Sequence, residues 1–326
     1  MSDLLKSIDE RTKLAGTNKL EILLFTLGED KRTKRREIFG INVFKVREVM
    51  RTPPITAAPE MPPAVEGMVS LRGVLVPVVD LAKYADVNAS APRDVMIVTE
   101  YNGHTQGFLV EAVDTILRLD WSKMRVPPEM LTAQMGGLVT AVTESKDGDL
   151  IMMMDVEKVL AATTNIEEED VRFKAIEPIE APNATVFYCD DSIVARRQIE
   201  RTLEAMGVKY IGATNGRQMW EELEKMASYA GAMNKKAADL ITLVLTDIEM
   251  PEMDGYILTK KIKNDPRFAG IPVVMHSSLS GMSNQSLGLS VGVDEYVPKF
   301  EPQRLAETVR RRVAERLGAA SVPATV

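Results

Sequence analysis

The sequence predicts two domains: an all-β domain, then an α/β domain with a doubly wound, five-stranded parallel sheet. The chain has 326 residues, a length that favours two domains over one. In the first half, turn-forming dipeptides such as Asn102-Gly103 and Asp147-Gly148 separate short apolar runs, a pattern typical of hairpins. In the second half, apolar runs alternate with amphipathic helical patterns, which favours βα units.

Short runs rich in Val, Ile, Leu and Met predict the strands of the first domain. They are Leu20–Leu27, Asp94–Glu100, Thr105–Val113, Leu138–Glu144 and Leu150–Asp155. Many short strands joined by turns are typical of barrels or a sandwich. Val156–Ala162 is expected to form a closing helix. Lys31–Arg36 holds five basic residues in six, and we interpret it as an exposed hairpin loop, with a contact to a receptor left open.

The second domain is expected to contain five βα units. Its predicted strands are Thr185–Cys189, Val208–Ala213, Leu240–Thr246, Pro272–His276 and Glu295–Val297, and three of its helices are Ser192–Met206, Gly216–Ala230 and Arg304–Arg316. The strand Leu240–Thr246 is continuously apolar, as expected at the buried centre of a parallel sheet. Residues Met226–Asp239 lengthen the connection before that strand, and we interpret them as a surface insertion with Gly231 as a helix breaker.

A linker is expected between the domains. Four acidic residues, Glu167–Asp170, are followed by Pro178 and Pro182, a composition typical of a linker. The predicted organisation is therefore a first domain over 1–165, a linker over 166–182 and a second domain over 183–326. The whole net charge of −7 lies in residues 1–182, because charges balance from Asn183 onward.

Composition excludes several classes of protein. The absence of a broad basic excess disfavours nucleic acid as a partner. No apolar run reaches the roughly 18 residues that a membrane span needs, and the polar N-terminus does not look like a secretory signal. The single cysteine, Cys189, excludes an intramolecular disulfide and fits a reducing cytoplasm.

Polar residues stand at the ends of the predicted strands of the second domain. They are Asp190, Asp191, Asp247, Ser277 and Lys299, with Tyr296 just before that lysine. In a doubly wound parallel sheet, ligands bind outside the carboxyl ends of the strands. The sequence therefore predicts one site that contains three carboxylates, a hydroxyl and an ammonium.

This set of groups suits a divalent cation and a phosphoryl group. Mg²⁺ prefers oxygen ligands and keeps several waters, and an aspartate beside a bound cation can act as a nucleophile on phosphorus. Phosphoryl transfer depends mostly on positioning and charge neutralisation. Mg²⁺ and Lys299 can supply that neutralisation, and the Ser277 hydroxyl can donate to a phosphoryl oxygen. Unrelated surface carboxylates and helix caps are the alternative interpretation.

The motifs of the second half resemble the receiver domain of two-component response regulators, with its flavodoxin-like fold, over roughly Ala184 to Leu317. They are Asp190–Ser192, Leu245–Gly255 (LTDIEMPEMDG), Pro272–Ser278 and Tyr296–Lys299. The resemblance implies that Asp247 is the phosphoacceptor, and that Asp190, Asp191, Asp247 and the backbone carbonyl of Glu249 bind Mg²⁺. It implies that Ser277, Lys299 and Tyr296 contact the phosphoryl group or switch with it.

One position departs from the receiver pattern. Most receivers have proline after the lysine, whereas this chain has Phe300. A cis peptide bond is therefore not expected there, because a non-proline cis bond is costly. The geometry around Lys299 is expected to differ accordingly.

Two segments of the first half, Phe39–Met50 and Val65–Leu81, resemble the CheW-like coupling domain of bacterial chemotaxis. The second segment contains a tight Arg72-Gly73 turn between two strands. The resemblance covers roughly Leu20 to Leu160 and implies paired small β-barrels that bind a chemoreceptor tip and a histidine kinase.

Four positions of this domain align with the region that binds receptor or kinase. They are Val46, Glu48, Gly67 and Arg72. Core packing of Val46, a solvated face at Glu48 and a hydrogen bond of Arg72 between the barrels are the alternative interpretations.

One coupling domain joined to one receiver resembles a known class of chemotaxis adaptors. It implies a phosphorylatable, non-enzymatic protein that links chemoreceptor tips to the chemotaxis histidine kinase, its phosphodonor. We expect it in the cytoplasm, attached to membrane-bound receptor arrays through protein contacts, without insertion into the membrane. A phosphate sink that drains the kinase is the main alternative. A transcriptional regulator is a weaker one, because no helix-turn-helix pattern is visible.

Overall fold

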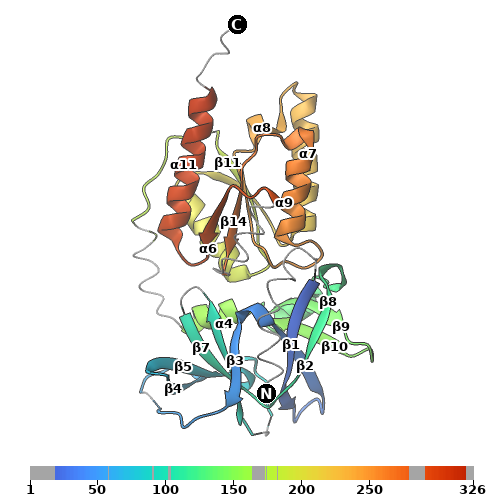
Figure 1. The fold of residues 1–326 in the computed structure, drawn as a ribbon, viewed down its shortest axis with the longest axis vertical. Helices are drawn as coiled ribbons and strands as arrows, with labels where there is room; N and C mark the ends of the chain where they lie inside the picture. The colour runs from blue at the N-terminus through green and yellow to red at the C-terminus, as the bar shows by residue number, and fades with distance from the viewer. Residues whose placement is uncertain are drawn as a thin grey trace. The chain divides into compact units, whose positions relative to one another are not determined.

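The computed structural model describes residues 19–57, 59–89, 92–101, 104–163, 173, 175–181, 183–278 and 291–320. They belong to two compact units, Lys19–Asn165 and the residues from Ile166 onward, both drawn in Figure 1. The Asn102-Gly103 dipeptide and the acidic run Glu167–Asp170 lie outside the described residues.

The first unit contains two five-stranded sheets, ordered β8-β1-β2-β10-β9 and β3-β6-β7-β5-β4. Its elements are β1 (Lys19–Glu29), β2 (Arg36–Asn42), η2 (Val43–Lys45), β3 (Val46–Arg51), β4 (Val65–Leu71), β5 (Val74–Asp80), α2 (Leu81–Tyr84), β6 (Val95–Tyr101), β7 (His104–Val110), β8 (Ala112–Asp120), η3 (Trp121–Lys123), α3 (Glu129–Gln134), β9 (Val139–Glu144), β10 (Leu150–Met154) and α4 (Val156–Thr163). The antiparallel pairing of β6 with β7 confirms the first predicted hairpin.

Both faces of each sheet are packed. Along β1, Leu23 and Phe25 join an apolar cluster that contains residues of both sheets and of α4, whereas Ile22 and Leu24 join a cluster on the opposite face. This follows from the alternation of side chains along a strand. The other sheet has its own second cluster, which includes Val78 and Met96. Two sheets with a shared core and separate second cores agree with the predicted pair of small barrels.

The second unit contains a five-stranded sheet, ordered β12-β11-β13-β14-β15, in which every pairing is parallel. Its elements are β11 (Thr185–Cys189), α6 (Ile193–Ala205), β12 (Lys209–Ala213), α7 (Gly216–Ala232), α8 (Ala237–Leu240), β13 (Leu243–Thr246), α9 (Gly255–Asn264), η4 (Pro266–Phe268), β14 (Val273–Ser277), β15 (Glu295–Pro298) and α11 (Pro302–Ala320). The predicted fold class of this half is confirmed.

Helices cover both faces of this sheet (Figure 1). Ile199 of α6 and Val309 of α11 pack in one apolar cluster, whereas Leu223 of α7 and Ile262 of α9 pack in another. Because the helices occupy the two faces, the loops that follow the strands are left at the carboxyl edge of the sheet, where the predicted site lies.

The connection before β13 differs from the prediction. Gly231 lies inside α7 and does not end it; the helix continues to Ala232, and Met233 caps it. A positive φ of 55° follows at Asn234. α8 then anchors the predicted insertion to the unit, because Ala237 is buried in the cluster on the α7 side. The central strand starts at Leu243 and not at Leu240, because Leu240 is the last residue of α8.

Part of the predicted linker packs on the second unit. Phe173, Ile176 and Ala181 are buried in the cluster beneath α6 and α11. The Arg201 guanidinium lies 4.1 Å from the centroid of the Phe173 ring. The described residues of this segment are therefore anchored along the helices.

Candidate functional site

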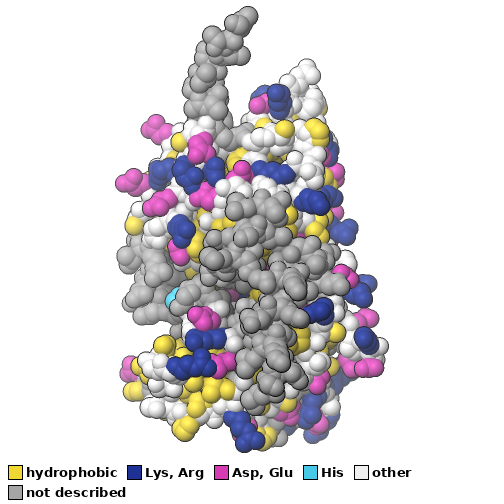
Figure 2. Space-filling model, in the orientation of Figure 1, with side chains coloured by type: hydrophobic (Ala, Val, Ile, Leu, Met, Phe, Trp, Pro, Cys, Tyr) yellow, Lys and Arg dark blue, Asp and Glu magenta, His cyan; other side chains and the backbone are white. Residues whose placement is uncertain are grey.

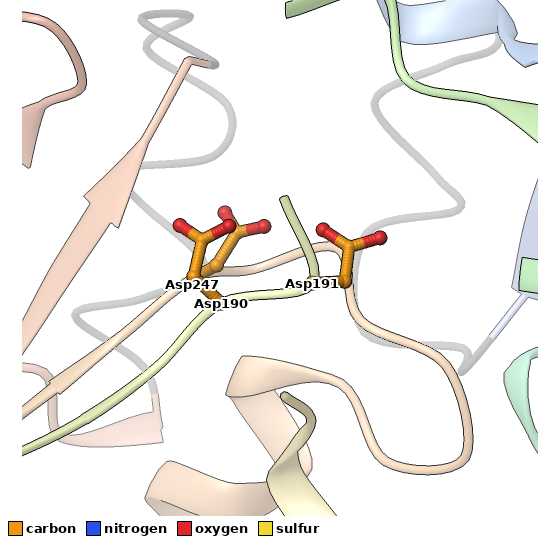
Figure 3. Close-up of side chains that lie close together, drawn as sticks. All are labelled: Asp190, Asp191 and Asp247. Carbon is orange, nitrogen blue, oxygen red and sulfur yellow. The ribbon is translucent and has the colours of Figure 1, made fainter. Parts of the chain in front are cut away.

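Asp190 and Asp247 are adjacent because of the strand register. Cys189 of β11 pairs directly with Thr246 of β13, and each aspartate is the next residue in its chain segment. Carboxylate oxygens of Asp190, Asp191 and Asp247 lie within 4.8 Å of one another. Figure 3 shows the three carboxylates pointing to the same side of the loops that carry them. The structure thus brings together the three predicted acids.

Lys299 joins this cluster from the end of β15. Its Nζ atom lies 2.9 Å from Oδ2 of Asp190 and 3.2 Å from Oδ2 of Asp247. The Lys299 side chain is buried, with 1% of the residue exposed. A buried ammonium is tolerated only where it is paired, and these two carboxylates supply the pairing.

Backbone and side-chain donors fix the acids in this arrangement. Oδ1 of Asp190 accepts a hydrogen bond from the Ser192 N–H at 2.9 Å, and Oδ1 of Asp247 accepts one from the Ile248 N–H at 2.7 Å. Nη1 of Arg196 donates to the carbonyl oxygens of Asp190 and Asp191, at 2.8 Å each. In both Asp190 and Asp247, one oxygen is thus held by the backbone while the other faces Lys299.

Gly255 lets α9 approach the site closely. A Cβ atom at this position would lie 2.0 Å from the Asp247 carbonyl oxygen. The preceding residue, Asp254, caps α9 by accepting a hydrogen bond from the Ile257 N–H at 2.8 Å. Burial raises the pKa of Asp254 to about 6.

Ser277 and Tyr296 lie on the two strands beside Lys299. Ser277 ends β14, is buried, and its carbonyl oxygen accepts a hydrogen bond from the Lys299 N–H at 3.2 Å. Tyr296 of β15 packs in a small apolar cluster with Ile248, the residue after Asp247. The Tyr256 hydroxyl, whose pKa is raised by burial, shares a hydrogen bond with Tyr296.

The donor set fits a divalent cation. Three carboxylates and one ammonium carry a formal charge of −2, which one such cation balances. The predicted fourth oxygen belongs to Glu249, a buried residue two positions after Asp247 in the loop before α9. Carboxylate and carbonyl oxygens are the ligands that Mg²⁺ prefers.

Sequence reasoning missed three residues of this site. Arg196 holds the acid loop, and Gln198 accepts a hydrogen bond from the Phe300 N–H. Both lie on α6 among other polar residues, and nothing in the periodicity separates them from a solvated helix face. Gly255 had a signal, because it follows Asp254, a residue type favoured at helix N-caps, and glycine is favoured where backbones approach closely. Phe300, noted as a departure, has a φ of 63°, and all peptide bonds among the described residues are trans, as expected for the Lys299–Phe300 bond.

The four positions predicted in the first unit lie in one sheet. Val46 is 7% exposed and belongs to the shared core, which fits the alternative of core packing. Glu48 and Arg72 form an ion pair, with Oε2 and Nη2 at 2.9 Å. Since β3 and β4 belong to the same sheet, this pair does not link the two barrels.

Gly67 lies where the Thr56 backbone pairs with β4, the last strand of that sheet, and the two backbones come too close for a side chain. The Thr56 and Met68 backbones exchange two hydrogen bonds of 2.9 Å. Gly67 has a φ of 140°, and a Cβ there would lie 2.2 Å from the Thr56 carbonyl oxygen. Positive φ values at Arg72 and Gly73 confirm the predicted two-residue turn, since such turns require them.

The basic segment Lys31–Arg36 is exposed, and its residues up to Arg35 connect β1 with β2, as predicted, whereas Arg36 already begins β2. Oδ1 of Asp30 anchors its start by accepting hydrogen bonds from the N–H groups of Arg32 and Thr33. Figure 2 shows Lys and Arg side chains interspersed with Asp and Glu over the described parts of one face. The helices of the described ranges include none with the length and apolar character that a membrane crossing requires.

Comparison with known proteins identifies two families along the chain. Residues 21–164 match the CheW-like domain, and residues 186–310 match the response regulator receiver domain. The chain is 28% identical to chemotaxis protein CheV1 of Helicobacter pylori, over 95% of this chain and 98% of that protein. It is 31% identical to chemotaxis protein CheW of Klebsiella aerogenes, over 46% of this chain and 88% of that protein. It is 37% identical to chemotaxis protein CheY1 of Helicobacter pylori, over 36% of this chain and 87% of that protein.

Proposed function

Because this chain belongs to the CheV-type chemotaxis proteins, which join a CheW-like domain to a response regulator receiver domain, we propose that phosphorylation of Asp247 controls it. In this proposal it couples chemoreceptor tips to a histidine kinase that is also the phosphodonor. The observation that carries the proposal is the buried group of Asp190, Asp247 and Lys299 at the carboxyl edge of the sheet.

The chemistry follows from these groups. A carboxylate oxygen of Asp247 attacks the phosphorus of a phosphohistidine; a P–O bond forms, the P–N bond breaks, and the histidine leaves with its electron pair and takes a proton. Asp190, Asp191, Asp247 and the Glu249 carbonyl would hold Mg²⁺, which supplies positive charge for the phosphoryl oxygens. Lys299 supplies a second cation in a site where little water weakens it. The protein accepts a phosphoryl group and is not proposed to be an enzyme.

Ser277 and Tyr296 would transmit the modification. Phosphorylation adds about −1.5 to −2 charges and new acceptor oxygens, to which the Ser277 hydroxyl can donate. Tyr296 shares a cluster with Ile248, directly after the phosphoacceptor, so a shift of this loop changes the packing of its ring. Such a local change needs an element with two arrangements to be transmitted further.

The first unit would supply the contacts with receptor and kinase. Glu48 of β3 and Arg72 of the turn after β4 come from opposite ends of the strand order and offer a pair of charged groups. Val46 and Gly67 hold the strands that carry them. These contacts would attach the protein to membrane-bound receptor arrays, through protein and without insertion into the bilayer.

The test is transfer of label from a phosphorylated chemotaxis histidine kinase in the presence of Mg²⁺. Asp247→Asn should abolish an acid-stable, base-labile label, because it removes the nucleophile. Asp265→Asn is the matched control, since Asp265 pairs with Arg267 on the surface. Equal labelling of wild type and Asp247→Asn would refute the assignment. A phosphate sink would instead show rapid loss of label and no Asp247-dependent change in receptor binding.

A further inference from the structure

The peptide group after Lys299 has a hydrogen-bonding requirement that a proline would not have. Phe300 carries a backbone N–H, which proline lacks, and this N–H donates to Oε1 of Gln198 at 3.1 Å. Gln198 lies on α6 and is 7% exposed. The acceptor is therefore a buried side chain of α6, an element far from Phe300 in the sequence.

The Phe300 backbone conformation also needs support. Its φ of 63° lies in the left-handed region, which costs a non-glycine residue about 1–2 kcal/mol. Such conformations persist where the surroundings determine them. The hydrogen bond from the Phe300 N–H to Gln198 is a contact that can hold the left-handed conformation of Phe300.

The backbone is held on both sides of the Lys299 side chain. The Lys299 N–H donates to the Ser277 carbonyl oxygen at 3.2 Å, which fixes the residue to β14. The next N–H, that of Phe300, is fixed to α6 through Gln198. These two hydrogen bonds set the direction in which the ammonium extends toward Asp190 and Asp247.

The same helix also holds the acids that face this ammonium. Two residues before Gln198, Arg196 binds the carbonyl oxygens of Asp190 and Asp191. The first turns of α6 thus touch both partners of the ion pair, the acid loop through Arg196 and the lysine loop through Gln198.

We propose that Gln198 is a positioning residue for Lys299. Its side chain accepts the Phe300 N–H and holds the left-handed turn that follows the lysine. The proposal rests on the proposed function, since Lys299 matters there as the cation beside the phosphoacceptor.

The experiment replaces Gln198 by methionine, which keeps the length of the side chain but offers only a weak acceptor. Phosphorylation of the full chain by acetyl phosphate with Mg²⁺ should slow by about threefold to tenfold, the range for one net hydrogen bond. Gln218→Met is the matched control: Gln218 accepts a hydrogen bond from the Thr214 N–H at 3.1 Å, after the strand at the opposite edge of the sheet. Its rate should equal that of wild type.

A double substitution separates positioning from general stability. In a Lys299→Ala background no ammonium remains to be positioned, so adding Gln198→Met should change the remaining phosphorylation rate by less than about 1.5-fold, within ordinary additivity error. If Gln198→Met slowed the reaction equally with and without the Lys299→Ala substitution, the proposal would be overturned. A merely structural role of Gln198 predicts that equal slowing.

Amide hydrogen exchange gives a test that does not depend on phosphorylation or on the folding of the Lys299→Ala variant. In Gln198→Met, the Phe300 amide should exchange faster, while the Ile248 amide, bonded to Asp247, stays protected. An unchanged Phe300 amide would overturn the proposal. If wild type accepts no phosphoryl group from acetyl phosphate, the proposed function fails, and the exchange of the Phe300 amide still decides the role of Gln198.

Discussion

Lys299 reaches Asp247 across an intervening strand. Nζ of Lys299 lies 3.2 Å from Oδ2 of Asp247, although β13 and β15 are separated by β14 in the sheet. Both residues are buried, so water does not screen the interaction as it would on the surface. The ion pair therefore links the centre of the sheet to its edge at the carboxyl end.

Lys299→Ala should destabilise the metal-free protein and strengthen its binding of Mg²⁺. Removing one partner of a buried ion pair costs about 3–5 kcal/mol, because the carboxylates then repel one another. Loss of the competing cation should tighten Mg²⁺ binding by about tenfold or more, since each 1.4 kcal/mol of relieved repulsion corresponds to tenfold. Chemical denaturation and calorimetric titration with Mg²⁺ measure the two effects.

Lys263→Ala is the matched control for this prediction. Lys263 also pairs with one aspartate, with Nζ 2.6 Å from Oδ2 of Asp294, but its side chain is 26% exposed and outside the acid cluster. Its removal should leave Mg²⁺ binding unchanged. Weaker Mg²⁺ binding in Lys299→Ala than in Lys263→Ala would contradict the role of Lys299 as a competing cation.

The acid cluster could be predicted because two rules combine. Apolar runs identify the strands, and parallel strands bring their carboxyl ends to one edge. Asp190, Asp247 and Lys299 each follow such a run, so their meeting needs no knowledge of side-chain conformation. The contacts of Arg196 and Gln198 could not be predicted in this way, because they depend on the rotation of α6 against two loops.

The sequence did not reveal β8, which has a weak burial pattern. β8 buries only Leu119 well and alternates poorly, so the predicted strand Thr105–Val113 runs across the end of β7 into it. α7 passes through Gly231 although glycine in a helix costs about 1 kcal/mol. The neighbouring Ala230 is buried, and Ala237 and Ile241 of the α8 region pack in the core on this side of the sheet. These tertiary contacts outweigh the local preference.

Asp254→Asn should stabilise the second unit increasingly as the pH rises. Burial raises the pKa of Asp254 to about 6, so the folded state holds the proton more tightly than the unfolded state. Wild-type stability therefore falls as pH rises from about 4 to 6, and the variant escapes this loss. The free-energy difference between variant and wild type should grow by about 2–3 kcal/mol between pH 4 and pH 7, while asparagine still caps α9. Chemical denaturation followed by Trp220 fluorescence measures this difference. Both proteins carry Trp121→Phe, so that only the second unit contributes to the signal.

Asp265→Asn is a control with the opposite sign. The hydrogen bond from Arg267 lowers the pKa of Asp265, so its contribution is present at neutral pH and is lost as the pH falls. This variant should therefore lose stability relative to wild type as the pH rises. Parallel pH profiles of the Asp254 and Asp265 variants would show that burial of Asp254 does not control its titration.

Gly67→Ala should destabilise the first unit far more than Gly73→Ala. Both glycines have positive φ, 140° at Gly67 and 84° at Gly73, but only Gly67 lacks space, since nothing lies within 4 Å of a Cβ at Gly73. The backbone at Thr56 cannot give way without breaking its bridge to Met68. We expect a loss of about 3 kcal/mol or more at Gly67 and about 1–2 kcal/mol at Gly73. Chemical denaturation followed by Trp121 fluorescence measures both losses, in proteins that carry Trp220→Phe so that only the first unit contributes to the signal. Equal losses would contradict the close approach of Gly67 to the Thr56 backbone.

Arg310→Ala should loosen the segment before the receiver domain without unfolding that domain. Nη2 of Arg310 donates to the Glu177 carbonyl oxygen at 2.7 Å, and Nη1 to that of Pro178 at 3.4 Å. The next residue, Ile179, donates its N–H to the Met206 carbonyl oxygen at 3.0 Å. Without the arginine, exchange of the Ile179 amide should quicken by about tenfold, the factor for one net hydrogen bond of about 1.4 kcal/mol.

Arg304→Ala tests whether this effect is specific to Arg310. Arg304 lies on the same helix, exposed, and its Nη1 is 3.7 Å from Oε2 of Glu301, so its loss should leave the Ile179 amide unchanged. Faster exchange in both variants would indicate a general loosening of α11. Unchanged exchange in Arg310→Ala would mean that burial of Ile176 and the ring of Phe173 hold the segment by packing alone. Faster exchange in Arg310→Ala alone would identify α11 as an element that fixes residues 177–179 to the second unit.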